Sequence, residues 1–482
     1  MPRWPWAGSA KVTAIAALAM LNVFGIAAGG VLAWRLPGRL AQWKVPTVAA
    51  EHVAGPGTVL AGAGGAGPVP TPAGLAAKLT GLLSDGMLGS HVTAVVADLD
   101  SGKVLFDRDG GSPSAPASTA KLATAVAALD ALGPGARFTT RVVQSGPGGI
   151  ILAGGGDPAL AAGRPPSGQY PEPATLQALA AGTAQALRAR HLSTVRLGYD
   201  TSLYSGPALA PGWPRSYVST GNVTGITSLE VDQGRLLPDG LPQDADDPGN
   251  LRPRSLNPAG DAAGAFARFL HRDGIRVTGP PRPARAASGA SQLAAVTSPP
   301  VTAMVAQMLT ESNNVIAENL ARQVAIATKH PATFGGAAAA VTEVVRGLGA
   351  GAGVHLVDGS GLSPRDRIPA ATLVRLVSLA AATAHPDLRG AITGLPVAGF
   401  SGTLSTGQSV FGDLDETARG MVRAKTGNLD TVVSLAGLVD DRDGTVLTFA
   451  FMADKVPAAR DLLPAAAQID KLADALAGCG CG

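Results

Sequence analysis

Aromatic and charged residues are both scarce in this 482-residue chain, at 4% and 15% of the total. Few aromatic rings leave little material for stacking nucleic-acid bases. A formal net charge of +3 over this length is also too small to indicate binding to phosphate backbones. Disordered proteins combine high charge with few apolar residues, whereas 46% of this chain is hydrophobic. The composition therefore indicates two or three folded domains and argues against a nucleic-acid partner.

Cysteine is rarer still, with only Cys479 and Cys481 in a C-terminal Gly-Cys-Gly-Cys-Gly tail. Two cysteines cannot build a disulfide framework, and a four-ligand metal site would need partners from elsewhere in the chain. They could close a small loop, cross-link two chains, or lie in an exposed tail without a role. The sequence predicts no metal site and no cofactor.

Several catalytic motifs are also missing. The chain has no G-x-S-x-G turn, no H-E-x-x-H metal motif and no G-x-x-x-x-G-K-[ST] phosphate loop. Its seven histidines are scattered. A Ser-His-Asp triad could still be assembled by folding, but nothing in the sequence points to one.

One long hydrophobic run, residues 12–34, contains no charged residue. As a helix rising about 1.5 Å per residue it would extend roughly 35 Å, enough to cross the ~30 Å hydrocarbon core of a bilayer. This length favours an uncleaved anchor over a cleaved signal peptide, whose apolar region is usually about 7–15 residues. Both interpretations stay open for residues 1–34. Residues 35–72 read as a Pro- and Gly-rich linker, and the rest of the chain is expected outside the cytoplasm, anchored to the membrane or released to the cell wall.

Strand patterns occur near both ends of the remaining chain, with Ala-rich helical patterns between them. The expected strands are residues 91–97, 103–106, 421–427, 432–439 and 445–452. The expected helices include residues 73–83, 118–132 and 458–477. This order predicts an α+β fold with one antiparallel sheet built from both ends. Residues 73–140 and 290–477 would form this discontinuous domain, residues 141–289 an inserted accessory region, and residues 478–482 a tail.

Only one lysine in the chain follows a serine by three residues, in Ser118-Thr119-Ala120-Lys121. On a helix such residues share a face, with Cβ atoms about 5–6 Å apart, so the lysine amine can reach the serine hydroxyl. Serine needs a base to become a nucleophile, and burial can make lysine neutral near pH 7. Pro116-Ala117-Ser118 would also put the serine at a helix start, where free N–H groups favour developing negative charge. Taken alone, the pair could instead be a helix cap and a surface charge.

The tripeptide Lys425-Thr426-Gly427 lies in a predicted strand. Glycine in a strand permits close approach of another backbone or a ligand, and Lys425 offers a fixed cation for a carboxylate. The edge of this strand could supply one N–H of an oxyanion hole, with the Ser118 N–H as the other.

A Ser-x-Asn sequence occurs twice, as Ser255-Leu256-Asn257 and Ser312-Asn313-Asn314. The first precedes a proline and reads as a loop. The second precedes an apolar helical stretch, where a hydroxyl and an amide could relay a proton and hold a substrate amide. Its position between the other two motifs favours residues 312–314.

Ser-x-x-Lys, Ser-x-Asn and Lys-Thr-Gly in this order are the signature of penicillin-binding proteins and serine β-lactamases. Over roughly residues 75 to 475 the chain resembles the D-alanyl-D-alanine carboxypeptidase/endopeptidase family, the class C low-molecular-mass penicillin-binding proteins. Four further segments carry the resemblance: Gly154-Gly155-Gly156-Asp157-Pro158, Pro211-Gly212-Trp213-Pro214, Asp358-Gly359-Ser360-Gly361-Leu362-Ser363 and Ser401-Gly402-Thr403-Leu404.

The resemblance implies a penicillin-binding-protein or serine β-lactamase-like antiparallel sheet with helices on both faces and a large insertion. It implies that Ser118 is the nucleophile and Lys121 the base. The other implied catalytic residues are Ser312, Asn314 and Lys425, and the implied substrate-binding residues are Thr426, Gly427, Asn428, Ser360 and Arg365. Ser118 and Asn428 would supply the oxyanion N–H groups.

Family members cleave terminal D-Ala from peptidoglycan stem peptides or cut D-Ala–diaminopimelate cross-links, and β-lactams acylate their serine. The resemblance therefore implies a serine-type DD-peptidase, with carboxypeptidase and endopeptidase activities both open. The long segment between Ser118 and Ser312 argues against a class A β-lactamase, in which this step is far shorter. Another hydrolase on the same scaffold (a β-lactamase or an esterase) and a non-catalytic cell-wall binding protein remain the alternatives.

Overall fold

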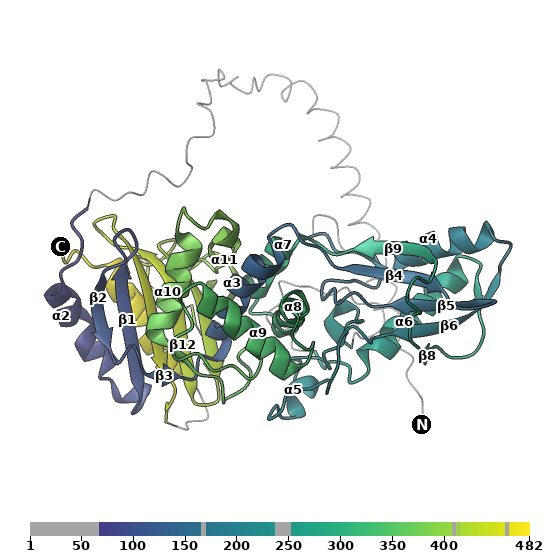
Figure 1. Cartoon of the computed structure of the whole chain (residues 1–482). Coiled ribbons are helices and arrows are strands. Elements are labelled where there is room, and N and C mark those ends of the chain that lie inside the picture. The colour runs from purple at the N-terminus through teal and green to yellow at the C-terminus, as the bar shows by residue number, and fades with distance from the viewer. Residues whose placement is uncertain (1–66, 165–169, 237–251, 407–410, 413, 458–461) are drawn as a thin grey trace, which may run out of the picture. The chain divides into compact units, whose positions relative to one another are not determined.

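Five strands from the two ends of the described chain form one antiparallel sheet, in the order β11-β12-β13-β1-β2 (Figure 1). The central pairing joins β1 to β13, with Val95 opposite Ala450. The prediction of one sheet built from both ends is confirmed. Its strands are β1 (Val92–Asp98), β2 (Val104–Arg108), β11 (Val422–Leu429), β12 (Val432–Asp440) and β13 (Val446–Ala453).

The computed structural model describes residues 67–482 except 165–169, 237–251, 407–410, 413 and 458–461. The predicted anchor or signal peptide, residues 1–34, lies outside the described residues, as does most of the linker at 35–72. Within the described ranges no helix is long and apolar enough to cross a membrane.

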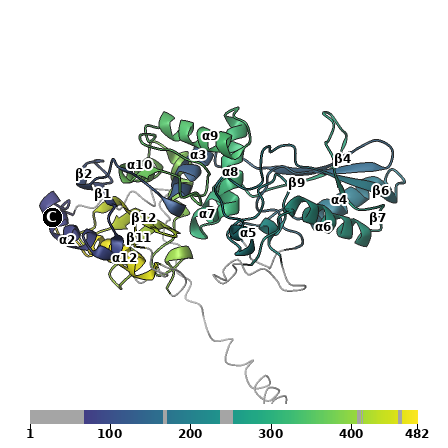
Figure 2. The same ribbon diagram turned by 90° about the horizontal axis from the view of Figure 1, so that it is seen from below.

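Helices cover both faces of this sheet because its side chains alternate between two cores. In β1, Ala94 and Val96 belong to one apolar cluster, whereas Val95 and Ala97 belong to the other. The first cluster includes side chains of α2 (Pro72–Leu83) and α12 (Leu463–Ala477), and the second those of α3 (Lys121–Leu132) and α10 (Ala370–Ala381). Figure 2 shows α10 and α12 on opposite sides of the sheet.

Further helices extend the second cluster away from the sheet. They pack around α3, which is buried along most of its length. The helices are α7 (Val301–Thr310), α8 (Asn314–Ala327), α9 (Phe334–Gly347) and α11 (Gly390–Thr393).

A second, mixed sheet forms the inserted region, in the order β7-β6-β5-β4-β9 with β8 beside β6. Its strands are β4 (Thr139–Gln144), β5 (Gly149–Ala153), β6 (Thr194–Asp200), β7 (Arg276–Val277), β8 (Arg282–Pro283) and β9 (Gln292–Thr297). Its helices are α4 (Leu176–Arg188), α5 (Ser216–Ser219) and α6 (Pro258–Arg272). The sheet extends past both ends of the predicted insertion, residues 141–289, because β4 and β9 pair with each other.

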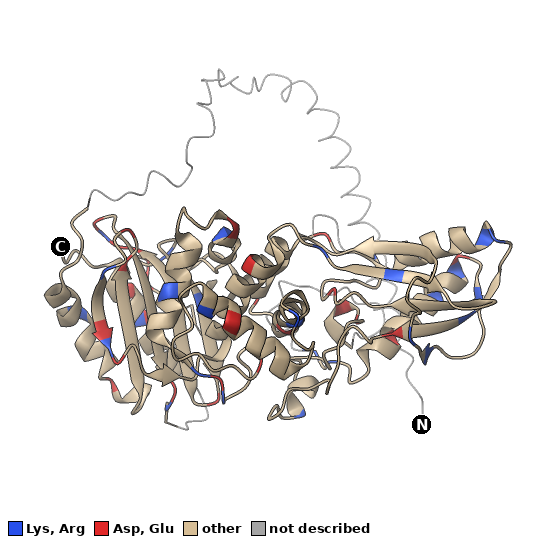
Figure 3. Cartoon of the chain, viewed as in Figure 1, with Lys and Arg blue, Asp and Glu red and all other residues tan. Residues whose placement is uncertain are grey.

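Short elements complete the described chain. They are β3 (Pro113–Ser114), β10 (Ile368–Pro369) and the 3₁₀ helices η2 (Gly86–Leu88), η3 (Ala117–Ala120), η4 (Asp232–Gly234), η5 (Pro386–Arg389) and η6 (Gly402–Leu404). Charged residues of both signs are scattered over the described chain (Figure 3).

The C-terminal tail is packed against the start of α2. Cys479 and Cys481 form a disulfide, and Cys479 is fully buried in the cluster that includes α2 and α12. The Thr71 N–H donates to the Cys481 carbonyl at 2.9 Å. Of the three sequence interpretations, the small disulfide loop is correct. The exposed tail without a role is wrong, because Cys479 is buried in the apolar core.

Candidate active site

Ser118, the candidate nucleophile, lies in η3 immediately before α3. The preceding residue, Ala117, has φ +47°, a conformation that costs a non-glycine residue of order 1–3 kcal/mol and is often found at active sites. Two hydroxyls hold the carbonyl of Pro116, because Thr119 Oγ1 and Ser434 Oγ each donate to it at 2.7 Å. The surroundings therefore fix the backbone that leads into Ser118.

Lys121 begins α3 and has three polar neighbours. Its Nζ lies 2.8 Å from Ser118 Oγ, 2.7 Å from Asn314 Oδ1 and 2.8 Å from the Ser360 carbonyl oxygen. The last two atoms can only accept hydrogen bonds. A neutral amine has two N–H groups and one lone pair, so both N–H groups point to these acceptors. The lone pair is then left for the Ser118 hydroxyl.

Burial favours this neutral form. Lys121 has no exposed surface, and burial lowers the pKa of its amine from the usual 10.5 to about 7, although Asp358 and Glu318 raise it. Burial also lowers the pKa of Lys425 well below its usual range, and the nearby Lys121 lowers it further. Lys121 is therefore able to act as a base near pH 7.

Asn314 reaches Lys121 from the first turn of α8. Its Nδ2 donates to the Asn222 carbonyl at 2.9 Å, which points Oδ1 toward Lys121. Asn313 caps the helix by accepting from the Ile316 N–H at 3.1 Å. Ser312, which precedes this cap, has φ +57°. The motif thus supplies a cap and an amide ligand for Lys121.

The competing Ser-x-Asn sequence has a structural role in the inserted region. The Ser255 hydroxyl donates to Asp261, and Asn257 caps α6 by accepting from the Gly260 N–H at 3.3 Å. The structure therefore gives no reason to move the candidate site from residues 312–314 to residues 255–257.

The Lys-Thr-Gly tripeptide lies on β11, an edge strand beside η3. Lys425 is fully buried, and its Nζ donates to the Thr426 carbonyl at 2.8 Å. Thr426 Oγ1 lies 2.7 Å from Thr403 Oγ1, in the segment Ser401-Gly402-Thr403-Leu404. Asn428 is exposed near the end of the strand. Lys425 is therefore bound to the backbone of its own strand and is not exposed as a cation.

Gly427 brings β11 close to the nucleophile. A Cβ placed on this residue would lie 3.1 Å from the Ser118 nitrogen, 2.8 Å from the Pro116 oxygen and 2.3 Å from Ser434 Oγ. Only glycine leaves room for this approach.

The turn at residues 358–363 forms another wall of the site. Asp358 Oδ1 accepts from the N–H groups of Ser360 and Gly361 at 3.1 and 2.7 Å, and its Oδ2 accepts from Ser363 at 2.7 Å. Trp213 Nε1 donates to the same Oδ2 at 2.8 Å. Ser360 is fully buried, and its carbonyl accepts from Lys121 Nζ. The sequence had suggested that its side chain binds substrate, but this side chain is not exposed.

Arg365 lies on the exposed side of this turn and links it to the inserted region. Its Nη2 donates to the Pro211 carbonyl at 2.7 Å, next to Gly212 and Trp213. Two segments that carried the family resemblance separately are thus joined in space.

Sequence reasoning missed four residues that organise the site: Asn222, Thr124, Glu318 and Thr403. Asn222 contributes only a backbone carbonyl, which has no sequence signal. Thr124 and Glu318 do have a sequence signal. Thr124 follows Lys121 by three residues and therefore lies on the same face of its helix. Glu318 follows Asn314 by four residues and lies on the same helix face as Asn314. Thr403 lies in a segment quoted only for its resemblance.

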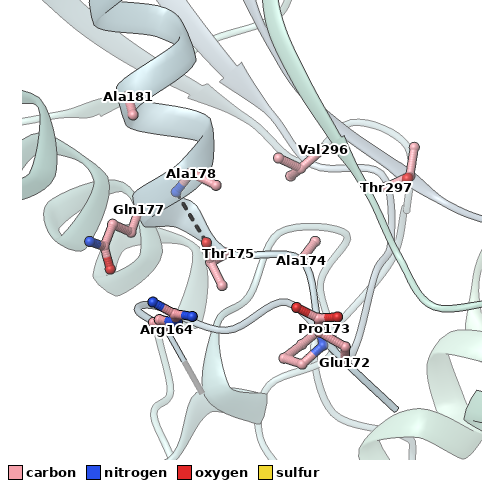
Figure 4. A pocket seen from close by; sticks show the side chains of 10 residues that line it. All are labelled: Arg164, Glu172, Pro173, Ala174, Thr175, Gln177, Ala178, Ala181, Val296 and Thr297. Carbon is pink, nitrogen blue, oxygen red and sulfur yellow. Dashed lines mark hydrogen bonds between the residues drawn. The ribbon is translucent and has the colours of Figure 1, made fainter. Parts of the chain in front are cut away.

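A hollow of about 530 Å³ lies elsewhere, in the inserted region near the start of α4 and the end of β9 (Figure 4). Its lining residues include Arg164, Glu172 and Gln177 and none of the motif residues. Among the described residues no cluster of three or more His, Cys, Asp or Glu side chains could hold a metal ion.

Known proteins match this chain over most of its length. The pattern of the D-Ala-D-Ala carboxypeptidase 3 (S13) family matches residues 75–251 and 237–476. Carboxypeptidase DacB of Mycolicibacterium smegmatis is 37% identical over 419 residues, covering 86% of this chain and 86% of that protein. A D-alanyl-D-alanine carboxypeptidase of an Actinomadura species is 29% identical over 430 residues, covering 75% and 78%.

The fold has a counterpart among solved structures. Penicillin-binding protein 4 (dacB) from Haemophilus influenzae superposes with a TM-score of 0.66 at 22% identity, covering 84% of this chain and 98% of that one. This likeness confirms the predicted α+β architecture. Together with the sequence matches, it means that the chain belongs to the D-Ala-D-Ala carboxypeptidase 3 (S13) family.

Proposed function

We propose that this serine-type D-Ala-D-Ala carboxypeptidase uses Ser118 as nucleophile and Lys121 as general base. The observation that carries this assignment is the 2.8 Å separation of Lys121 Nζ from Ser118 Oγ, with the other two partners of Nζ being acceptors only. The lowered pKa of Lys121, about 7, supports the same roles.

The reaction proceeds in two steps. Ser118 Oγ attacks the carbonyl carbon of the penultimate D-Ala while its proton passes to Lys121 Nζ. The tetrahedral intermediate collapses by breaking the C–N bond, and the departing amine takes a proton from Lys121 or through Ser312. Water then attacks the ester on Ser118, which releases the shortened peptide and restores the serine.

Charge develops on the substrate carbonyl oxygen during both steps. The N–H groups of Ser118 and Asn428 are our candidates for the donors that stabilise it, because Gly427 allows β11 to approach Ser118 closely. Removal of one such donor in other enzymes costs about 2.7–4 kcal/mol. Thr426 and Thr403 offer paired hydroxyls for the terminal carboxylate, and the Nζ of the buried Lys425 donates to the Thr426 carbonyl beside them.

The substrate class follows from the family and from the names of the relatives, which are carboxypeptidases. We assign the terminal D-Ala-D-Ala of peptidoglycan stem peptides as substrate and β-lactams as acylating inhibitors. Cutting of D-Ala–diaminopimelate cross-links is the alternative activity of the same site, with Arg365 and Asn428 at its exposed edge. This substrate requires an extracytoplasmic location, for which residues 12–34 would be the membrane anchor or signal.

Release of D-Ala from a synthetic peptide ending in D-Ala-D-Ala tests this function, using the full chain beside Ser118→Ala. Release by the wild type and none by the variant is expected. D-Ala release by Ser118→Ala would contradict the assigned nucleophile. Rapid consumption of penicillin without peptide cleavage would indicate a β-lactamase instead.

A further inference from the structure

We propose that Glu318 is a positioning residue for this reaction, because it holds the backbone turn that orients Lys121. The inference rests on the proposed roles of Ser118 and Lys121. Glu318 belongs to none of the three sequence motifs, and its side chain is completely buried.

Two side chains on one face of α8 orient Lys121, one directly and one through the Ser360 backbone. Asn314, in the first turn, accepts directly from Lys121 Nζ at 2.7 Å. Glu318 follows Asn314 by four residues, so the two side chains project from the same face of the helix. Glu318 acts at one remove, through the carbonyl of Ser360.

The peptide units of Gly359 and Ser360 are held at every polar atom. Glu318 Oε1 accepts from the Gly359 N–H at 3.0 Å and the Ser360 N–H at 2.8 Å, and its Oε2 lies 3.2 Å from the Gly359 nitrogen. Thr124 Oγ1 donates to the Gly359 carbonyl at 2.6 Å. The Ser360 carbonyl accepts from Lys121 at 2.8 Å.

The turn at Gly359 is packed closely against α8. A Cβ on Gly359 would lie 2.7 Å from the Ala321 side chain and 3.1 Å from the Ala317 carbonyl oxygen, so the turn lies directly on α8. Buried N–H groups that lose their acceptor are strongly disfavoured. Without the Glu318 carboxylate, the Gly359 N–H would lose its acceptor and the Ser360 N–H would keep only Asp358 Oδ1, at 3.1 Å. We therefore expect the turn to shift, and the Ser360 carbonyl to move with it away from Lys121.

Glu318 also contributes charge. Burial and the neighbouring Asp358 raise the pKa of Glu318 to about 8, and its negative form raises the pKa of Lys121. Replacement by glutamine keeps one acceptor oxygen for the turn, whereas replacement by alanine removes both. The charged groups that surround Lys121 and Glu318 are Asp358, Asp366, Arg322 and Lys425.

The test compares the rate constant for acylation of the full chain by benzylpenicillin, as a function of pH, in three variants. Glu318→Ala removes the acceptor, Glu318→Gln keeps it, and Asn319→Ala is the matched control on the same helix. Asn319 is equally buried, but it bonds to Glu230 and to the Val315 carbonyl rather than to the turn.

We expect Glu318→Ala to lose about 100-fold in acylation rate, the effect of displacing a catalytic group by about 1 Å. Glu318→Gln should remain within about tenfold of the wild type, because glutamine keeps one acceptor oxygen for the turn. Asn319→Ala should lose stability but keep the acylation rate and the pH profile.

Wild-type rate and pH dependence in a folded but destabilised Glu318→Ala would overturn the inference, because the residue would then be merely structural. Should Glu318→Ala not fold, a loss of about 100-fold or more in a folded Glu318→Gln, which keeps an acceptor for the turn, would overturn it equally. Failure of the wild type to be acylated at all would instead contradict the proposed function, and this inference with it.

Discussion

At the scale of single residues, the proposed chemistry depends on the protonation state of Lys121. The pKa of this amine is lowered to about 7, so the reactive neutral form is lost as the pH falls below about 7. The acylation rate constant should therefore rise through about pH 7 and level off above it. Stopped-flow acylation by a chromogenic β-lactam across this range measures the midpoint.

Lys121→Arg is the control for this prediction, since arginine stays protonated and cannot act as a base. It should not be acylated at any of these pH values. A rate independent of pH through neutrality, or a midpoint near the usual lysine value, would argue against Lys121 as the base.

Gly427→Ala tests the close approach of β11 to the nucleophile. The added Cβ would meet Ser434 Oγ at 2.3 Å and the Pro116 oxygen at 2.8 Å, so the strand or η3 must shift. We expect acylation to fall about 10- to 100-fold, because small displacements of reacting groups have effects of this size. Gly111→Ala, at a position with open space around it, should leave the rate unchanged. Equal rates in both variants would mean that Gly427 has no special role.

The sequence predicted the pair proposed to react, but not the residues that orient it. Ser118, Lys121 and Asn314 were identified by spacing, and the structure brings them within hydrogen-bond distance. Asn222 and Glu318 were missed because their effect passes through backbone groups of other segments. Such contacts depend on the folded path of the chain, which local spacing does not reveal.

At the scale of elements, the N-terminus of α8 sets the position of Asn314. Its cap, Asn313, also donates to Gln233 Oε1 at 2.8 Å, in the inserted region. Asn313→Ala should lower the free energy of unfolding by about 1–2 kcal/mol, the upper part of the range for a lost cap. It should also slow acylation, because the first turn of α8 loses its anchor. Urea unfolding and benzylpenicillin kinetics measure the two effects.

Asn257→Ala is the matched control, since Asn257 caps α6 in the same way within the inserted region. It should lose about 1 kcal/mol without any change in the acylation rate. If the two variants behave alike in acylation, the cap of α8 does not control the site.

The boundaries of elements also show where sequence patterns suffice. The expected strands at residues 432–439 and 445–452 agree closely with β12 and β13, because both are continuous apolar runs bounded by a turn. The expected helix at 118–132 is divided into η3 and α3, since Ala117 and Ser118 follow the backbone that β12 and β11 impose on them. Tertiary contact decides this detail.

At the scale of the whole molecule, both ends of the described chain are joined in one sheet and one core. Strand patterning predicted the sheet, but it gave no sign that the tail after α12 would return to α2. The predicted insertion, residues 141–289, begins inside β4 and ends before β9. The pairing of β4 with β9 has no local sequence signal, so strand patterning could not reveal it.

Replacing Cys479 and Cys481 together by alanine tests the role of the tail. A disulfide across so short a loop should contribute about 1–2 kcal/mol through loop closure. We therefore expect a small loss in unfolding free energy, no change in acylation, and a wild-type protein whose thiols react with iodoacetamide only after reduction. Two free thiols in the native protein, or a disulfide-linked dimer, would contradict this arrangement.

The measurement that tests the central claim most directly is the intact mass of the full chain after incubation with benzylpenicillin, followed by peptide mapping. The account predicts one penicilloyl group, located on the peptide that contains Ser118 and absent from Ser118→Ala. An adduct on any other residue, or one retained by Ser118→Ala, would contradict the assignment of Ser118 and Lys121 as the reacting pair.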